Sequence, residues 1–152
     1  MKIYNTLTGS KEMFKPIKED IVSIYVCGPT VYNYIHIGNA RPMVVFDVLR
    51  RYLLYRGYSV KFVNNFTDVD DKIINQANEE NTEIEYITDK YINAYLEDAK
   101  ALNIYEEHTI HPKATEYIKQ MIDFIKGLED KGAAYNVDGN VYFRVKCAKD
   151  YG

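Results

Sequence analysis

Two short segments of the chain combine residue types that can bind and position a nucleotide. Residues 27–30 (CGPT), the strand-end turn, follow an apolar run, and residues 36–39 (HIGN), the helix-start segment, precede a helical pattern. Ligands of open α/β sheets bind beyond the carboxyl ends of the strands, and the free N–H groups at a helix N-terminus favour phosphate. His36 can donate a hydrogen bond to a phosphate oxygen, and Gly38 lets a flat base or a ribose approach the backbone. The pattern predicts a nucleotide site without a P-loop lysine, although a histidine before a helix is more often polar surface.

The residues around these segments predict a βαβ unit. The apolar run at residues 21–27 is typical of a strand buried on both faces, as in a parallel sheet, and residues 59–66 alternate like a second strand. Residues 40–56 between them have helical spacing. Because proline is tolerated only in a first helical turn, Pro42 makes Asn39 the expected N-cap. With a right-handed crossover of the usual length, the strand-end turn and the helix-start segment are expected to line one cleft.

Short strands and further helices are predicted on either side of this unit. They are strands at residues 2–7 and 13–16 with a turn at residues 8–10, helices at residues 67–80, 84–102 and 114–128, and a hairpin with strands at residues 133–136 and 140–145. Thr67 and Asp68 are the expected caps of the first of these helices, and Pro112 and Gly132 bound the last. The sequence therefore indicates an α/β fold.

The composition is that of an ordinary globular protein. The 152 residues are 47% hydrophobic and 27% charged, with a formal net charge of -3. This balance is not that of a disordered chain, and it provides no overall basic field for nucleic acid. The two cysteines, Cys27 and Cys147, fit a reducing compartment better than a disulfide scaffold. Since no apolar run approaches the roughly 18 residues that span a bilayer, a cytoplasmic protein without a membrane partner is expected.

Three blocks of the sequence, in order, resemble the cysteinyl-tRNA synthetase family. They are residues 3–8 (IYNTLT), residues 25–32 (YVCGPTVY) with residues 36–41 (HIGNAR), and residues 64–74 (NNFTDVDDKII). The resemblance implies an α/β fold, the first half of a Rossmann-like class I synthetase nucleotide-binding domain, with a parallel sheet, flanking helices and short β-hairpins. Residues 1–132 would be the N-terminal half of this catalytic domain, and residues 133–152 the start of a truncated β-rich insertion.

The same resemblance implies an activity and the residues that serve it. The complete enzyme would activate cysteine with ATP and Mg²⁺ and transfer it to tRNA(Cys), as a monomer in the cytoplasm. His36, Gly38 and Asn39 are implied to bind ATP, and His36 and Asn39 to be catalytic. The family signature is usually written HIGH, so Asn39 replaces its second imidazole with an amide that still forms hydrogen bonds.

The resemblance also implies how the substrate cysteine is held. Gly28, Thr30 and Thr67 are implied to bind it, and Cys27 to be one of four ligands of a zinc ion that binds the substrate thiolate. The other zinc ligands, a cysteine, a histidine and a glutamate, are expected beyond residue 152. The residues alone leave other interpretations open, since Cys27 could be a small buried hydrophobe and both threonines could serve turns and caps.

Three groups of charged or titratable residues are expected to be ordinary surface or helix-end residues. The groups are His108 with His111, Asp68 with Asp70 and Asp71, and Arg50 with Arg51 and Arg56. They could form a metal pair, a magnesium site and an RNA contact, respectively. We prefer the simpler interpretation of each group. The histidines are expected on solvated surface, the aspartates at a helix N-terminus that their charge favours, and the arginines on a solvated helix face.

Two further functions fit the residues. A related cysteine ligase that couples activated cysteine to an amino sugar in thiol biosynthesis would share the adenylation half and the zinc, and a non-catalytic nucleotide-binding module derived from a synthetase would lack the reaction. The lysine-rich signature usually written KMSKS is not found, because Lys146 and Lys149 lack its serines. Residues 150–152 close no recognisable element. The chain is therefore expected to be a fragment that alone neither activates cysteine nor holds stoichiometric zinc.

Overall fold

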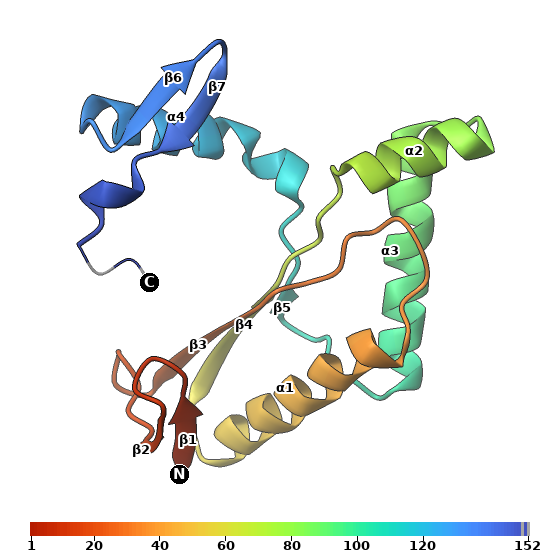
Figure 1. The fold of residues 1–152 in the computed structure, drawn as a ribbon. Coiled ribbons are helices and arrows are strands. Elements are labelled where there is room, and N and C mark those ends of the chain that lie inside the picture. Colours follow the sequence, from red (N-terminus) through yellow and green to blue (C-terminus); the bar gives the residue numbers. More distant parts are fainter. Residues whose placement is uncertain (150, 152) are drawn as a thin grey trace. The chain divides into compact units, whose positions relative to one another are not determined.

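The computed structural model describes residues 1–149 and 151, which fall into two compact units, Met1–Pro112 and Lys113–Gly152 (Figure 1). The division falls at Pro112 because the last helix packs with the hairpin that follows it. The boundary between residues 132 and 133 stays a prediction about the domains of the family. Within the described part of the chain, no helix combines the length and the apolar character needed to cross a membrane.

The first unit is built around a small parallel sheet. Its elements are β1 (Lys2–Asn5), β2 (Ser10–Met13), β3 (Ile21–Val26), α1 (Ile37–Tyr55), β4 (Ser59–Asn64), α2 (Asp71–Glu80), α3 (Ile84–Ala101) and β5 (Thr109–Ile110). β3, β4 and β5 form a three-stranded parallel sheet in that order, and β1 and β2 form an antiparallel hairpin. The predicted α/β fold and its β3–α1–β4 unit are confirmed, whereas the sequence pattern did not predict β5.

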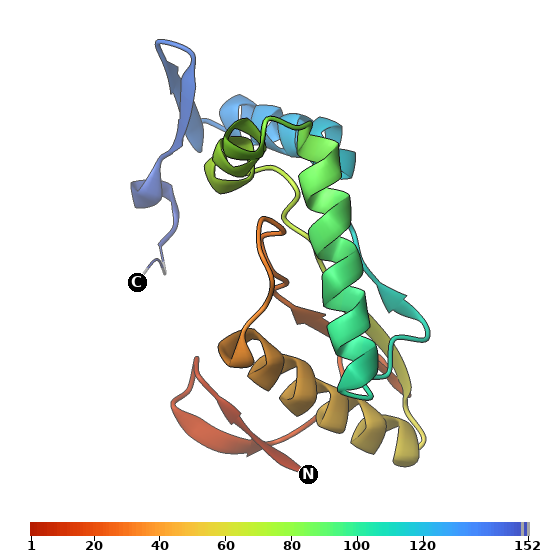
Figure 2. The same cartoon turned by 90° about the vertical axis from the view of Figure 1, so that its right-hand side faces the viewer.

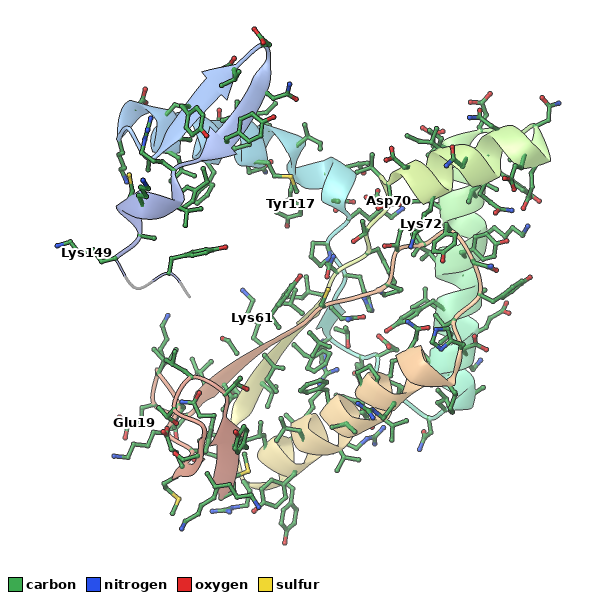
Figure 3. The ribbon with its side chains drawn as sticks, viewed as in Figure 1. Glu19, Lys61, Asp70, Lys72, Tyr117 and Lys149 are labelled. Carbon is green, nitrogen blue, oxygen red and sulfur yellow. The ribbon has the colours of Figure 1, made fainter. Side chains whose placement is uncertain are left out.

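The helices α1 and α3 cover only one face of the sheet. Figures 1 and 2 show both helices on the same side of β3 and β4. Asn64 of β4 is buried and contacts Tyr95 of α3, and the strand register places the buried Val22 of β3 on the same face of the sheet. On the other side Tyr25 is 65% exposed, and Lys61 points away from α1 (Figure 3). The prediction that β3 is buried on both faces is therefore wrong, because α1 and α3 both pack on the same side.

A buried cluster between α2 and α3 anchors the loops that leave the sheet. Its members are Val31, Phe66, Ile73, Ala77, Ile87, Tyr91, Ile92 and Tyr95. Val31 and Phe66 belong to the loops after β3 and β4, and the others belong to the two helices. Burying a large apolar side chain contributes about 1.5–3 kcal/mol, so this cluster holds both loops firmly against the helices.

Helix α1 begins earlier than the sequence pattern predicts. Its N-cap is His36, and Pro42 lies inside the helix. The prediction that Asn39 is the N-cap is therefore wrong. Proline has no N–H, so the carbonyl oxygen of Gly38 loses its usual donor four residues later. This is one of the first backbone hydrogen bonds of the helix, so its loss leaves the rest of the hydrogen-bonded helix intact. The proline is therefore tolerated at this position.

Helix α2 begins later than the sequence pattern predicts. Asp70 is its N-cap and accepts a hydrogen bond of 2.9 Å from the backbone N–H of Lys72; both residues lie at the start of the helix in Figure 3. Asp71 lies in the first turn, so the expected helix-end role is confirmed for these two aspartates. Thr67 and Asp68 precede the cap and do not serve as caps, and Asp68 is buried there.

The second unit contains one long helix and a hairpin. Its elements are a short 3₁₀ helix (Ala114–Tyr117), α4 (Ile118–Asp130), β6 (Ala134–Val137), β7 (Asn140–Phe143) and a second 3₁₀ helix (Val145–Cys147). Asp138 and Gly139 have φ angles of 50° and 86°, which is the conformation of a two-residue type I′ turn. The predicted hairpin is confirmed. Gly132, with a φ of 67°, follows the end of α4 as predicted.

Candidate active site

The strand-end turn and the helix-start segment lie next to each other beyond the carboxyl ends of β3 and β4. Thr30, His36 and Asn39 line one hollow, and Cys27, Gly28 and Asn39 line a second. Asn39 lines both hollows, so the two adjoin. The structure therefore brings together the two segments that the βαβ spacing places in one cleft.

His36 caps α1 through its own side chain. The ring Nδ1 accepts a hydrogen bond of 3.0 Å from the backbone N–H of Gly38, and the Oδ1 of Asn39 accepts one of 3.2 Å from the backbone N–H of His36. This arrangement is a capping box, with Asn39 in the third helical position. Since Nδ1 is the acceptor, the proton of the neutral ring lies on Nε2. The exposed side of His36 therefore presents an N–H donor at a helix N-terminus, which suits an anionic ligand.

Gly38 is required by the cap itself. A methyl group at this position would lie 2.6 Å from Cε1 and 2.9 Å from Nδ1 of His36. The ring could rotate away from a larger residue, but the Nδ1 bond to the helix backbone would then be lost. The absent side chain thus allows the histidine to cap the helix, a role that the sequence interpretation did not foresee.

Thr30 and Thr67 lie side by side on the loops that follow β3 and β4. The backbone N–H of Thr67 donates to Pro29 O at 3.1 Å, and the backbone N–H of Val31 donates to Thr67 O at 3.1 Å. These bonds form an isolated parallel bridge beyond the strand ends. Thr67 is not among the residues that line the two described hollows, although its neighbour Thr30 lines one of them.

Cys27 is exposed, and its thiol has only a weak contact of 3.8 Å with Gly28 O. The alternative interpretation of Cys27 as a buried hydrophobe is therefore wrong. Within residues 1–149 and 151, no group of at least three His, Cys, Asp or Glu side chains is arranged to hold a metal ion. Cys27 is a single accessible sulfur donor, and one donor does not make a zinc site.

Arg50 is buried and connects α1 to the segment around β5 through hydrogen bonds. The expectation that it lies on a solvated helix face is therefore wrong. It is 2% exposed, and its guanidinium donates to Glu107 O at 2.6 Å, to Thr109 Oγ1 at 2.7 Å and to Tyr105 O. The cation also lies over the rings of Phe62 and Tyr105. Burial lowers the pKa of Arg50. The loop after α3 folds back over α1 and covers this arginine.

The expectation of a solvated face is confirmed for the other two arginines of this region. Arg51 is exposed and pairs with Asp47 at 2.7 Å, and Arg56 is exposed and donates to the hydroxyl of Tyr52 at 2.9 Å. Asp47 itself is buried and also accepts a hydrogen bond of 2.8 Å from the backbone N–H of Tyr105, so it is the Arg51 end of this pair that faces solvent.

His111 is a structural residue, and the expectation of solvated surface is wrong for it. Its Nδ1 lies 2.8 Å from Asn64 O, its Nε2 lies 2.9 Å from Glu106 Oε2, and its ring stacks on Phe66 at a centroid distance of 4.8 Å. A carbonyl oxygen only accepts, so Nδ1 carries a proton. The expectation of solvated surface is confirmed for His108, whose side chain is 80% exposed.

Tyr95 of α3 reaches the end of β4 inside the second hollow. Its hydroxyl donates to Asn64 Oδ1 at 2.8 Å, and burial raises the pKa of Tyr95 above its ordinary value of 10.0. In the unfolded chain the phenol can ionise near that ordinary value, whereas in the folded chain it stays neutral to higher pH. The stability that Tyr95 contributes is therefore fully present below about pH 10 and is lost as the pH rises through the folded-state pKa.

Replacing Tyr95 by phenylalanine is expected to lower the free energy of unfolding of the chain by about 1 kcal/mol at about pH 8, because Asn64 loses its donor. The difference from the unaltered chain should narrow above about pH 10. Urea unfolding of both chains at several pH values measures it. Tyr86→Phe, at an exposed position of α3, serves as the matched control. A difference that stays constant or widens above pH 10 would contradict the assigned burial effect.

The comparisons with known proteins agree with the geometry. The family model described as the tRNA synthetases class I (C) catalytic domain matches residues 13–152. A cysteine–tRNA ligase from Finegoldia magna is 71% identical over 152 residues, covering 100% of this chain and 33% of the relative. Ligases of the same name from Fusobacterium nucleatum and Lactobacillus gasseri are 62% and 59% identical, covering 99% and 100% of this chain and 32% of each relative. The chain thus spans about a third of the length of the curated relatives it matches.

Proposed function

Because the chain belongs to the family of class I tRNA synthetase (C) catalytic domains, we propose that it forms part of a cysteine–tRNA ligase. The observation that carries this proposal is the identity of 59–71% to cysteine–tRNA ligases along practically the whole chain. The complete protein would join the cysteine carboxylate to the α-phosphorus of ATP with release of pyrophosphate. It would then transfer the cysteinyl group to tRNA(Cys).

The helix-start segment would bind the ATP phosphates, with Mg²⁺ as the counter-ion. The Nε2 proton of His36 provides a donor at this point, and the partial positive charge of the helix N-terminus adds to it. As the carboxylate attacks, negative charge accumulates on the phosphate oxygens, and fixed donors stabilise it. His36 and Asn39 are the proposed catalytic residues, because His36 supplies a donor and Asn39 holds its backbone in the capping box. Gly38 belongs to the ATP site by keeping the ring in place.

The strand-end turn and Thr67 would hold the substrate cysteine. Gly28 and Thr30 leave the end of β3, and the backbone bridge to Thr67 places both loops at one edge of the sheet. Hydroxyl groups and backbone atoms at such an edge can bind an amino group and a carboxylate. The proposal therefore places cysteine beside the phosphate donors of α1, as the reaction requires.

Cys27 would contribute one sulfur ligand to a zinc ion that recognises the substrate thiol. Zinc is thiophilic and favours the deprotonated thiol, which separates cysteine from serine by ligand softness. The described residues supply this one donor, and its exposure beside Gly28 fits the role. The remaining ligands belong to the residues that complete the catalytic domain. A cytoplasmic monomer that uses tRNA, cysteine and ATP, without a membrane partner, completes the proposal.

A cysteine-dependent pyrophosphate exchange assay tests this function on the full-length protein that contains these residues. Exchange should occur with cysteine and not with serine, and tRNA(Cys) should then accept the cysteine. Exchange without charging of tRNA would instead support a related ligase that passes activated cysteine to an amino sugar. No exchange with cysteine would contradict the proposal.

A further inference from the structure

The side chain of Asn65 joins the loops that follow β3 and β4. Its Oδ1 accepts a hydrogen bond of 2.9 Å from the backbone N–H of Gly28 and another of 2.9 Å from the hydroxyl of Tyr25. Its Nδ2 lies 3.5 Å from Thr67 Oγ1. One amide therefore contacts both the strand-end turn and Thr67, the two places proposed to hold the substrate cysteine.

The chemistry of these contacts requires an acceptor at one end of the side chain. A carbonyl oxygen has two lone pairs and can accept from Gly28 and Tyr25 at once, whereas the amide nitrogen can only donate to the hydroxyl of Thr67. The donors thus define which end of the amide faces Gly28. An apolar residue of similar shape would leave the N–H of Gly28 without this partner.

The backbone around Asn65 leaves little freedom for the strand-end turn. A methyl group on Gly28 would lie 1.6 Å from the backbone oxygen of Asn65, so the two loops are in direct contact. The neighbouring Asn64 donates from Nδ2 to Val26 O at 3.1 Å and fixes the end of β3. The backbone bonds of Thr67 to Pro29 and Val31 join the two loops, and the Asn65 amide adds the side-chain contact that fixes Gly28.

We propose that Asn65 is a positioning residue that holds the backbone of Gly28 and the hydroxyl of Thr67 in place, beside the backbone bridge between the two loops, and thereby sets the affinity for cysteine. The inference rests on the proposed function, because it assigns Asn65 to the cysteine side of that site. Asn65 acts through Gly28 and Thr67 and not through the phosphates, which are bound at α1. Its loss should therefore raise the KM for cysteine more than it lowers kcat or raises the KM for ATP.

The test uses the full-length ligase with Asn65→Leu, Asn65→Asp and Tyr25→Phe, and with Asn75→Ala as the control at an exposed position of α2. Leucine keeps the branched heavy-atom skeleton of asparagine and removes its hydrogen bonds, so the KM for cysteine in pyrophosphate exchange should rise about tenfold. Aspartate keeps the acceptor for Gly28, and the hydroxyl of Thr67 can rotate to donate to it. This variant should stay within about threefold of the natural enzyme.

The Tyr25→Phe variant removes only one of the two bonds to Oδ1, at an exposed position, and leaves the N–H of Gly28 bonded. It should raise the KM for cysteine about twofold without lowering the melting temperature, and it keeps the proposal testable if the leucine variant does not fold. The inference would be overturned if the KM values for cysteine and ATP rose equally. It would also be overturned if the KM for cysteine did not change in the Asn65→Leu and Tyr25→Phe variants. A natural enzyme without cysteine-dependent exchange would instead refute the proposed function itself.

Discussion

Replacing Gly28 by alanine is expected to lower the free energy of unfolding of the chain by about 3 kcal/mol, the upper part of the range for overpacking. The new Cβ would lie 1.6 Å from Asn65 O and 2.8 Å from Asn65 C, and both atoms belong to the backbone that follows β4. Backbone cannot rotate away as a flexible side chain can. The loops must therefore separate, and the hydrogen bond from the N–H of Gly28 to Asn65 Oδ1 breaks as they do. Urea unfolding of the 152-residue chain measures the loss.

The matched control for this substitution is Gly127→Ala in α4. A methyl group at Gly127 meets nothing within 4 Å, and the residue lies inside a helix. Alanine there should stabilise α4 by about 0.5–1 kcal/mol, because glycine loses more backbone entropy than alanine in a helix. If Gly28→Ala cost no more than about 1 kcal/mol, the close contact between the two loops would be wrong.

Replacing His36 by alanine in the full-length enzyme is expected to slow cysteine-dependent pyrophosphate exchange about a hundredfold, equivalent to about 3 kcal/mol of transition-state stabilisation. The Nε2 proton of His36 is the donor assigned to the phosphates, while the KM for cysteine depends on residues at the strand-end turn. The KM for cysteine should therefore change little. Pyrophosphate exchange at saturating ATP, with cysteine varied, measures both quantities.

A serine at position 36 separates the two roles of this histidine. Alanine removes the cap of α1 as well as the phosphate donor, and loss of a cap alone costs about 1 kcal/mol of stability. A serine hydroxyl can accept the bond from Gly38 and restore the cap, but it is shorter than the imidazole. His36→Ser should therefore recover stability and leave the exchange rate low. Recovery of the rate with serine would show that His36 acts only as a cap.

The elements with a strong periodic pattern could be predicted from the sequence, and the short or irregular ones could not. α1, α3 and the hairpin of β6 and β7 appear close to their predicted places because apolar spacing and turn residues determine them locally. β5 has only Thr109 and Ile110, too few residues for any period. The predicted start of α1 is too late, because it rests on the preference of proline for the first helical turn and does not consider that the side chain of His36 can cap a helix.

The candidate site could be predicted from the sequence, but the supporting contacts around it could not. His36, Gly38 and Asn39 follow from position in the βαβ unit and from the family resemblance. Arg50 and His111 have the residue types of a surface, and the fold of the segment around β5 buries Arg50 and brings the partly buried His111 against the end of β4. Asn65 lies within the block of residues 64–74, yet no pattern indicates that its amide faces Gly28. Such contacts join residues 37 or more positions apart, beyond the reach of local rules.

The most direct measurement is a crystal structure of the full-length ligase with a non-hydrolysable analogue of cysteinyl adenylate. The account predicts that the phosphate mimic lies within about 3 Å of His36 Nε2. It also predicts that the cysteinyl group lies between the strand-end turn and Thr67, with its sulfur toward Cys27. An analogue bound elsewhere, without contact to His36 and Thr30, would contradict the assignment of this edge of the sheet as the site of cysteine activation.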